Sequence, residues 1–174
     1  MEQNEPKTGK FALNFGVILG VVGIIFALML YSLDMHYQGG FAVMGVSITL
    51  TLIAVVIGML QFKKANNGFM SFGQAMKVGV GICLIGGIIS ILFNQVMQNV
   101  IDPEMMDKAL TFQREQLLAT SKMTPDQVDA QLEMGKKFST PSMQLIFGLI
   151  FIVVTAFIYS LIPALILKKN KNVN

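Results

Sequence analysis

Apolar residues gather into four long blocks along the chain, separated by two short polar turns and one long polar segment. The blocks cover residues 11–33, 41–62, 75–97 and 144–167. Each is long enough for a helix rising about 1.5 Å per residue to cross a hydrocarbon layer of about 30 Å. Lys77, the one charged side chain inside these limits, lies near the end of its block, where it can reach the interface. The pattern predicts an all-α integral membrane four-helix bundle.

Composition agrees with a membrane protein rather than a water-soluble one. The chain is 53% hydrophobic and 13% charged, whereas about a quarter of the residues in soluble domains are charged. The first block is too long for the apolar core of a signal peptide, which spans about 7–15 residues, and no small-residue cleavage site follows it. We therefore interpret it as a span. Cys83 is the one cysteine of the chain, so it has no intramolecular disulfide partner.

The polar segment 98–143 carries two helix-start signals, which predict a helical hairpin between the third and fourth spans. Asp102 precedes Pro103 as an N-cap precedes a first helical residue, and Thr124 precedes Pro125 in the same way. Gln127 completes a capping box with Thr124. The two predicted helices cover residues 103–120 and 125–138. A further pair, Thr140 and Pro141, predicts the start of the fourth span.

Both hairpin helices have an apolar stripe at helical spacing. The stripe residues are Met106, Leu110 and Leu117 in the first helix and Val128, Leu132 and Gly135 in the second. Such a stripe is usually buried, either between the two helices or against the membrane surface. The alternative is that it forms a docking face for a partner protein of the cell envelope.

Small residues recur at helical spacing in the first three spans, and we interpret them as helix-packing faces. They are Gly16, Gly20, Gly23 and Ala27, then Ser47, Thr51, Ala54 and Gly58, then Gly79, Cys83, Gly86 and Ser90. Within lipid, small residues let two helix backbones come into van der Waals contact where the hydrophobic effect gives no driving force. These faces predict tight contacts within the bundle or in a homo-oligomer.

The distribution of lysines predicts the orientation. Lysines lie in the tail 1–10, around the turn between spans two and three, and in the tail 168–174, whereas the turn between spans one and two has none. Since Lys and Arg in short loops stay in the cytoplasm, both termini are expected there, and the hairpin is expected outside. Five basic residues spread along the hairpin argue against this orientation, but they lie in a longer loop, where such residues count less. We expect the inner membrane of a bacterium.

Sequence motifs indicate no catalytic, cofactor-binding or metal-binding residues, so we expect neither an enzyme nor a nucleic-acid partner. The hydroxyls of Thr51 and Thr155 usually bond to their own helix. Six polar residues gather at the external end of spans one and three: Asp34, His36, Asn94, Gln95, Gln98 and Asn99. They suggest a polar mouth or a metal site, but one His beside one Asp is more often part of an interfacial loop, which is the interpretation we favour.

The motif "FMSFGQAMKVGVG" leading into the third span, and "QNVIDPE" before a helical insert ahead of the fourth, resemble the bacterial membrane proteins grouped as domain of unknown function 4199. The resemblance extends over residues 10–169 and implies an integral inner-membrane protein with no established activity. Two functions remain open. One is a non-enzymatic scaffold or accessory subunit whose hairpin binds a partner, and the other is a small oligomeric channel or transporter.

Overall fold

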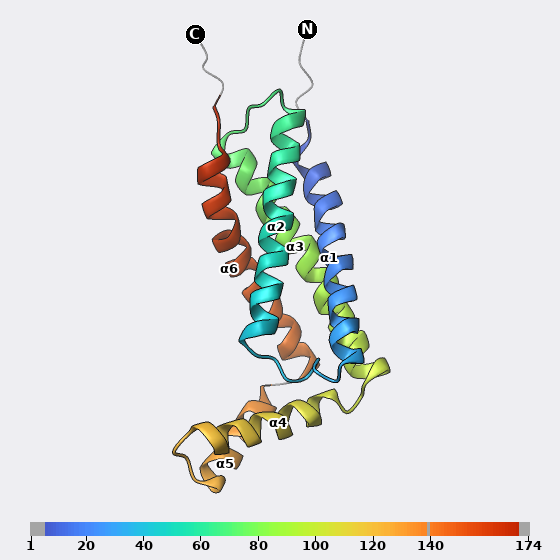
Figure 1. Ribbon diagram of the computed structural model, residues 1–174, viewed down its shortest axis with the longest axis vertical. Helices are drawn as coiled ribbons and strands as arrows, with labels where there is room; N and C mark the ends of the chain where they lie inside the picture. Colours follow the sequence, from blue (N-terminus) through green and yellow to red (C-terminus); the bar gives the residue numbers. More distant parts are fainter. Residues whose placement is uncertain (1–5, 139, 171–174) are drawn as a thin grey trace.

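Helix α3 (Phe72–Val96) lies at the centre of the bundle and contacts each of the other three long helices. In the computed structural model, which describes residues 6–138 and 140–170, these are α1 (Thr8–Ser32), α2 (Phe41–Ala65) and α6 (Pro141–Leu167) (Figure 1). All four are long and apolar enough to cross a membrane, as the sequence predicts. Their outward faces expose many large apolar side chains, which suits contact with lipid. The chain is an all-α membrane helical bundle.

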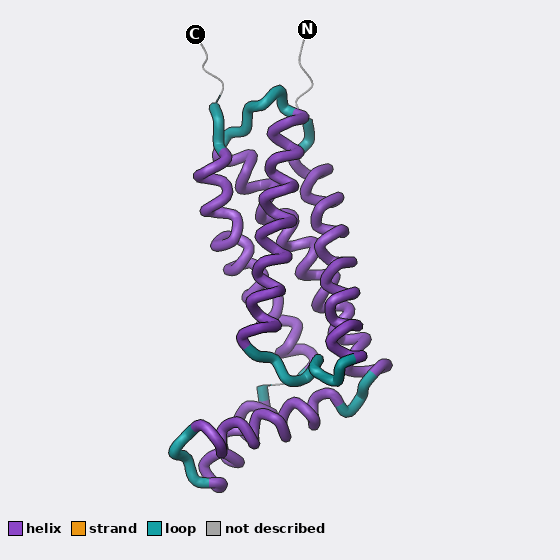
Figure 2. The backbone as a smooth tube through the Cα atoms, in the orientation of Figure 1, coloured by secondary structure: helices purple, strands orange, loops and turns teal. Residues whose placement is uncertain are grey.

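A short π-helix and a two-helix hairpin follow α3. The π-helix η1 (Met97–Ile101) continues α3, and the hairpin consists of α4 (Met105–Thr120) and α5 (Pro125–Lys137). The hairpin lies beyond one end of the bundle, which we call the hairpin end (Figure 2). Helix α1 begins and helix α6 ends at the opposite end, which we call the termini end (Figure 1). Parts of the predicted tails 1–10 and 168–174, including Lys171, lie outside the described residues.

Local capping decides where three of the helices begin. Thr124 and Gln127 form the predicted capping box of α5, and the Thr140 hydroxyl accepts a hydrogen bond from the Met143 amide at the start of α6. A third cap was not predicted: Ser71 forms a capping box with Gln74. Because this box satisfies free amides at the helix start, α3 begins at Phe72, ahead of the predicted 75.

Glycines bring α1 and α3 into close contact. A Cβ atom added at Gly16 would lie 2.7 Å from the Cβ of Ile85 and 3.2 Å from the carbonyl oxygen of Ile82. At Gly20 it would lie 2.7 Å from two side-chain carbons of Ile89. The carbon–carbon distances of 2.7 Å at Gly16 and Gly20 are shorter than a van der Waals contact between carbons, about 3.5–4.0 Å. The two backbones can lie this close only because these positions carry no side chain.

Glycines of α3 make equally close contacts with its other neighbours. A Cβ at Gly79 would lie 2.5 Å from Met59 of α2 and 2.6 Å from the Ser160 hydroxyl of α6. Gly81 and Gly87, which are not on the predicted packing face, would meet Ala12 of α1 at 2.6 Å and Ile152 of α6 at 2.7 Å. Glycines of α3 thus face all three neighbouring helices.

The termini end of the bundle is tightly packed and tied together. Met59, Phe62 and Met70 are fully buried there. The backbones of Met70 and Lys169 exchange two hydrogen bonds of 2.9 and 2.8 Å, which join the α2–α3 turn to the end of α6. The ammonium group of Lys63 also donates to the carbonyl oxygen of Leu167 at 2.8 Å, where a cation suits the negative end of the helix dipole.

The hairpin is held together by its own contacts. Val128 of α5 is fully buried, whereas the other residues of the predicted stripe are partly exposed and Gly135 is exposed. Arg114 of α4 donates two hydrogen bonds to the Asp129 carboxylate of α5, at 2.6 and 3.1 Å. The apolar stripe therefore packs between the two helices at Val128, with one exposed ion pair beside it.

We predict that Gly16→Ala destabilises the bundle by about 1–3 kcal/mol, because the added methyl group overpacks the α1–α3 contact. Ile85 cannot yield easily, since the atom in the way is its Cβ. Gly45→Ala is the matched control, since nothing lies within 4 Å of a Cβ at that position. Thermal unfolding of the purified protein in mild detergent measures both. Equal melting temperatures for the two variants would contradict the packing role of Gly16.

Candidate functional site

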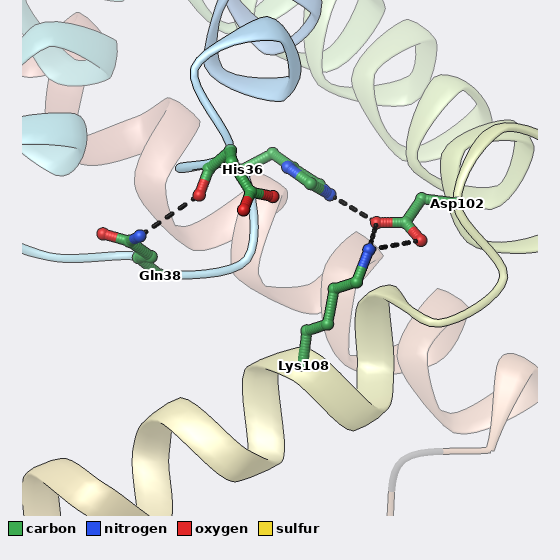
Figure 3. Close-up of polar contacts among 5 residues, drawn as sticks. His36, Gln38, Asp102 and Lys108 are labelled. Carbon is green, nitrogen blue, oxygen red and sulfur yellow. Dashed lines mark hydrogen bonds and ion pairs between the residues drawn. The ribbon is translucent and has the colours of Figure 1, made fainter.

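The Asp102 carboxylate joins three segments of the chain at the hairpin end of the bundle (Figure 3). One oxygen, Oδ2, lies 2.8 Å from Nε2 of His36, in the loop between α1 and α2. Both carboxylate oxygens accept hydrogen bonds from the ammonium group of Lys108 on α4, at 3.1 and 3.0 Å. The side chain of Asp102 is 8% exposed and that of His36 is 4% exposed. This cluster fastens the first residues of the hairpin to the bundle.

The π-helix η1 places Asp102 in this position. The Asp102 amide donates to the carbonyl oxygen of Met97, five residues earlier, at 2.8 Å. The Asp102 carbonyl oxygen then accepts from the Met105 amide at 3.0 Å, in the turn that leads to α4. The prediction that Asp102 caps the first hairpin helix was wrong. The Asp102 carboxylate is engaged by His36 and Lys108 instead, and helix α4 begins later, at Met105, after an N-cap residue, Glu104, that makes no side-chain cap.

His36 lies in the loop between α1 and α2, at the end of the spans, and its side chain is also buried in the cluster. Its ring packs edge-on against Tyr31 and Tyr37, with ring centres 5.0 and 5.3 Å away. Asp34 has a positive φ of 55°, and its carbonyl oxygen accepts from Gln38 at 3.1 Å, which closes the loop (Figure 3). This tight turn directs His36 toward Asp102.

The charges of the cluster fix the protonation state of its carboxyl group. Lys108, and to a lesser degree His36, hold the pKa of Asp102 below its ordinary value of 3.8. The Asp102 carboxylate in turn raises the pKa of Lys108. Because an ionised carboxylate only accepts hydrogen bonds, Nε2 of His36 must carry the proton between them. In the neutral ring, Nδ1 is then an acceptor, and it is buried without a hydrogen-bond partner in the described part of the chain.

A cavity of about 460 Å³ extends from His36 into the hairpin half of the bundle, between α1, α2, α3 and α6. Most of its wall is apolar. Several predicted packing residues line it, because their small side chains leave room there: Gly23, Ala27, Ser47, Thr51, Cys83, Gly86 and Ser90. Of the other predicted positions, Gly16, Gly20, Gly58 and Gly79 are buried and Ala54 is partly buried. The small residues thus lie both at helix contacts and around a cavity.

The other polar residues predicted at this end bond mainly along their own helix. Gln98 donates to the side-chain oxygen of Asn94, and Asn99 donates to the carbonyl oxygen of Gln95 at 2.6 Å. Asp34 acts on the cluster only at a distance, through the charge of Lys108. Among residues 6–138 and 140–170, no three His, Cys, Asp or Glu side chains are placed to hold a metal ion. The site is therefore a histidine hydrogen-bonded to the lysine-paired Asp102 carboxylate, beside an apolar cavity.

Lys108 was missed by the sequence analysis, and Asp102 was assigned a different role. The sequence signal was weak, because His36 and Asp102 are 66 positions apart and Asp102 and Lys108 are not at a helical spacing.

A family model described as protein of unknown function (DUF4199) matches residues 14–169. No curated protein and no solved structure matches the chain.

We predict that Asp102→Asn loosens the start of the hairpin, because it removes the charge that Lys108 and His36 share. Amide hydrogen exchange over residues 105–111 should become several-fold faster. Asp129→Asn, which removes the exposed ion pair with Arg114, is the control, since exposed pairs contribute little to stability. If both variants exchange alike over these residues, Asp102 does not fasten the hairpin.

We also predict that the attachment of the hairpin to the bundle through Asp102 persists in mild acid. The folded pKa of Asp102 is lowered, so the stabilisation by its carboxylate is complete above the unfolded pKa of about 3.9 and is lost as the pH falls through the folded value. A spin label at Thr111→Cys should therefore keep its mobility from pH 7 to about 4 and become mobile only below that. In the Asp102→Asn background the label should be mobile already at pH 7. A transition of the wild type between pH 5 and 7 would contradict this assignment.

Proposed function

The chain belongs to the DUF4199 family of proteins of unknown function, so the family assigns it no activity, and we propose a function from the geometry of the structure. The protein is a non-enzymatic scaffold or accessory subunit of the bacterial inner membrane. Its α4–α5 hairpin is the part that engages another protein of the cell envelope. The observation that carries this proposal is the buried Asp102 cluster, which fixes the base of the hairpin on the bundle.

Fixing a hairpin in one orientation is useful for binding. A loop that is ordered before it meets its partner loses less conformational entropy in the complex. Here Asp102 holds the start of α4, and Arg114 with Asp129 and Val128 hold α5 against α4. The hairpin therefore presents one defined surface to the surroundings.

Part of that surface is apolar. Met134 and Phe138, one helical turn apart, are 65% and 56% exposed. They form what we call the hairpin patch, and Lys136 and Lys137 lie beside it in the last turn of α5. An apolar centre with charged residues at its edge is the usual composition of a protein interface. A complementary partner surface would be apolar and rimmed by carboxylates.

The proposed topology places both termini in the cytoplasm and the hairpin outside. The lysine distribution supports it, and the arrangement of the helices agrees, because α1 begins and α6 ends at the same end of the bundle, opposite the hairpin (Figure 1). Lipid surrounds the exposed apolar faces of the four spans. Self-association through these faces is compatible with the hairpin binding a partner.

The channel or transporter alternative has one supporting observation, the cavity in the hairpin half of the bundle. At the termini end, however, the buried side chains of Met59, Phe62 and Met70 fill the space between the helices. A solute path through one chain would need these side chains to move apart. Flux of ions or small solutes through purified protein in liposomes would favour the channel over the scaffold.

We predict that a photoreactive residue at Met134 or Phe138, in the full-length protein in cells, gives a discrete crosslink to a second protein. Glu133, which is exposed and points about 100° away from Met134 around α5, is the matched control position. A Met134→Cys variant should also react with a membrane-impermeant maleimide in intact cells, which tests the side of the membrane. Crosslinks to lipid alone would show that the hairpin rests on the membrane surface and would overturn the scaffold proposal.

A further inference from the structure

We propose that the cavity between the four long helices binds a long-chain alcohol from the membrane, with its chain in the apolar part and its hydroxyl group at His36. The proposal concerns the interior of the bundle and does not depend on the hairpin patch. It stands on three observations: the unused polar atoms at one end of the cavity, the apolar character of the remaining wall, and the opening of the cavity toward lipid.

The polar end offers one acceptor and one donor. Nε2 of His36 donates to Asp102, so in the neutral ring Nδ1 is an acceptor, and it is buried without a partner among the described residues. Asn94, which also lines the cavity, accepts from Gln98 through its side-chain oxygen, which leaves its amide group to donate. Both residues line the cavity, so a ligand hydroxyl group there can donate to Nδ1 or accept from the Asn94 amide. Leaving a buried polar atom unpaired is costly, so a ligand that pairs it gains affinity.

The hydroxyl side chains elsewhere in the wall do not add to this polar end. Ser47 and Thr51 of α2 donate to carbonyl oxygens of their own helix at 2.9 and 2.8 Å. Ser90 of α3 donates to Gly86 at 3.0 Å, and Thr155 of α6 donates to Phe151 at 2.7 Å. Bonded to backbone in this way, these side chains present mainly carbon to the cavity. The wall therefore suits a hydrocarbon chain.

The cavity is accessible from the bilayer. Met44 of α2 and Phe151 of α6 line it and are 52% and 67% exposed, so the cavity is not closed off by protein at these side chains. Its volume of about 460 Å³ lies within the range of small-molecule sites, about 300–1,000 Å³. A membrane-dissolved molecule can therefore reach the cavity sideways, between apolar side chains, without crossing water.

The charges at the cluster favour a neutral head group. The Asp102 carboxylate is already paired with Lys108, so the cluster with neutral His36 has no net charge to offer a ligand. A carboxylate or phosphate would bring a second acceptor against Nδ1 and would have to shed its water to enter, which is expensive without a paired cation. An alcohol supplies the donor without that cost.

The test uses the wild-type protein in liposomes and two photoreactive probes. One is a long-chain primary alcohol with a diazirine in its chain, and the other is its methyl ether, which keeps the chain and loses the hydroxyl proton. We expect saturable labelling by the alcohol within residues 83–97 and 151–159, which form two walls of the cavity. Labelling by the ether should need about fivefold more probe, the factor that one hydrogen bond contributes.

Two leucine substitutions on α1 provide the matched variants. Ala27→Leu places a larger side chain in the cavity and should reduce labelling by the alcohol to the non-saturable background level. Val21→Leu adds a methylene on the exposed face of the same helix and should leave labelling unchanged. Equal labelling by alcohol and ether, label spread over outward-facing residues, or full labelling of the Ala27→Leu protein would each overturn the proposal.

Discussion

The close approach of α3 to its three neighbours is the constraint on which the rest of the bundle depends. Helices in a bilayer associate through packing and hydrogen bonds, because lipid chains are as apolar as the helix side chains and the hydrophobic effect gives no driving force. Glycines along α3 let side chains of α1, α2 and α6 rest against its backbone. Contacts with α1 and α6 fix the position of α3. Because η1 continues α3, this position also decides where Asp102 lies.

The two ends of the bundle differ in how they are closed. At the termini end, large side chains fill the interior, and backbone hydrogen bonds join the α2–α3 turn to the end of α6. At the hairpin end, small side chains leave a cavity, and the buried Asp102 carboxylate joins the hairpin to the bundle beside an edge-on contact between the rings of Tyr37 and Phe112. The first end is held by many weak contacts. The second depends on a few polar atoms, so its geometry is more sensitive to a single substitution.

Features with short-range signals were predictable from the sequence. The four spans follow from hydrophobic blocks, and the starts of α5 and α6 follow from Thr124 with Gln127 and from Thr140, whose partners are three residues away. Asp102 has the same local signal, a capping residue directly before proline, but the outcome differs. Its carboxylate finds a partner 66 positions away, and a tertiary contact of this kind leaves no periodic pattern in one sequence. The partner of His36 could not be predicted for the same reason.

The π-helix η1 between α3 and the hairpin makes the direction of the Asp102 side chain depend on the number of residues in this segment. Successive residues of an α-helix point about 100° apart, so one residue more or fewer rotates everything that follows by that angle. In η1 the Asp102 amide bonds five residues back rather than four, which absorbs one residue in the helix. A relative with a single deletion among residues 97–101 would turn the equivalent carboxylate away from the histidine, even if every side chain of the cluster were retained. Alignments of this region therefore have to be judged by spacing as well as by residue identity.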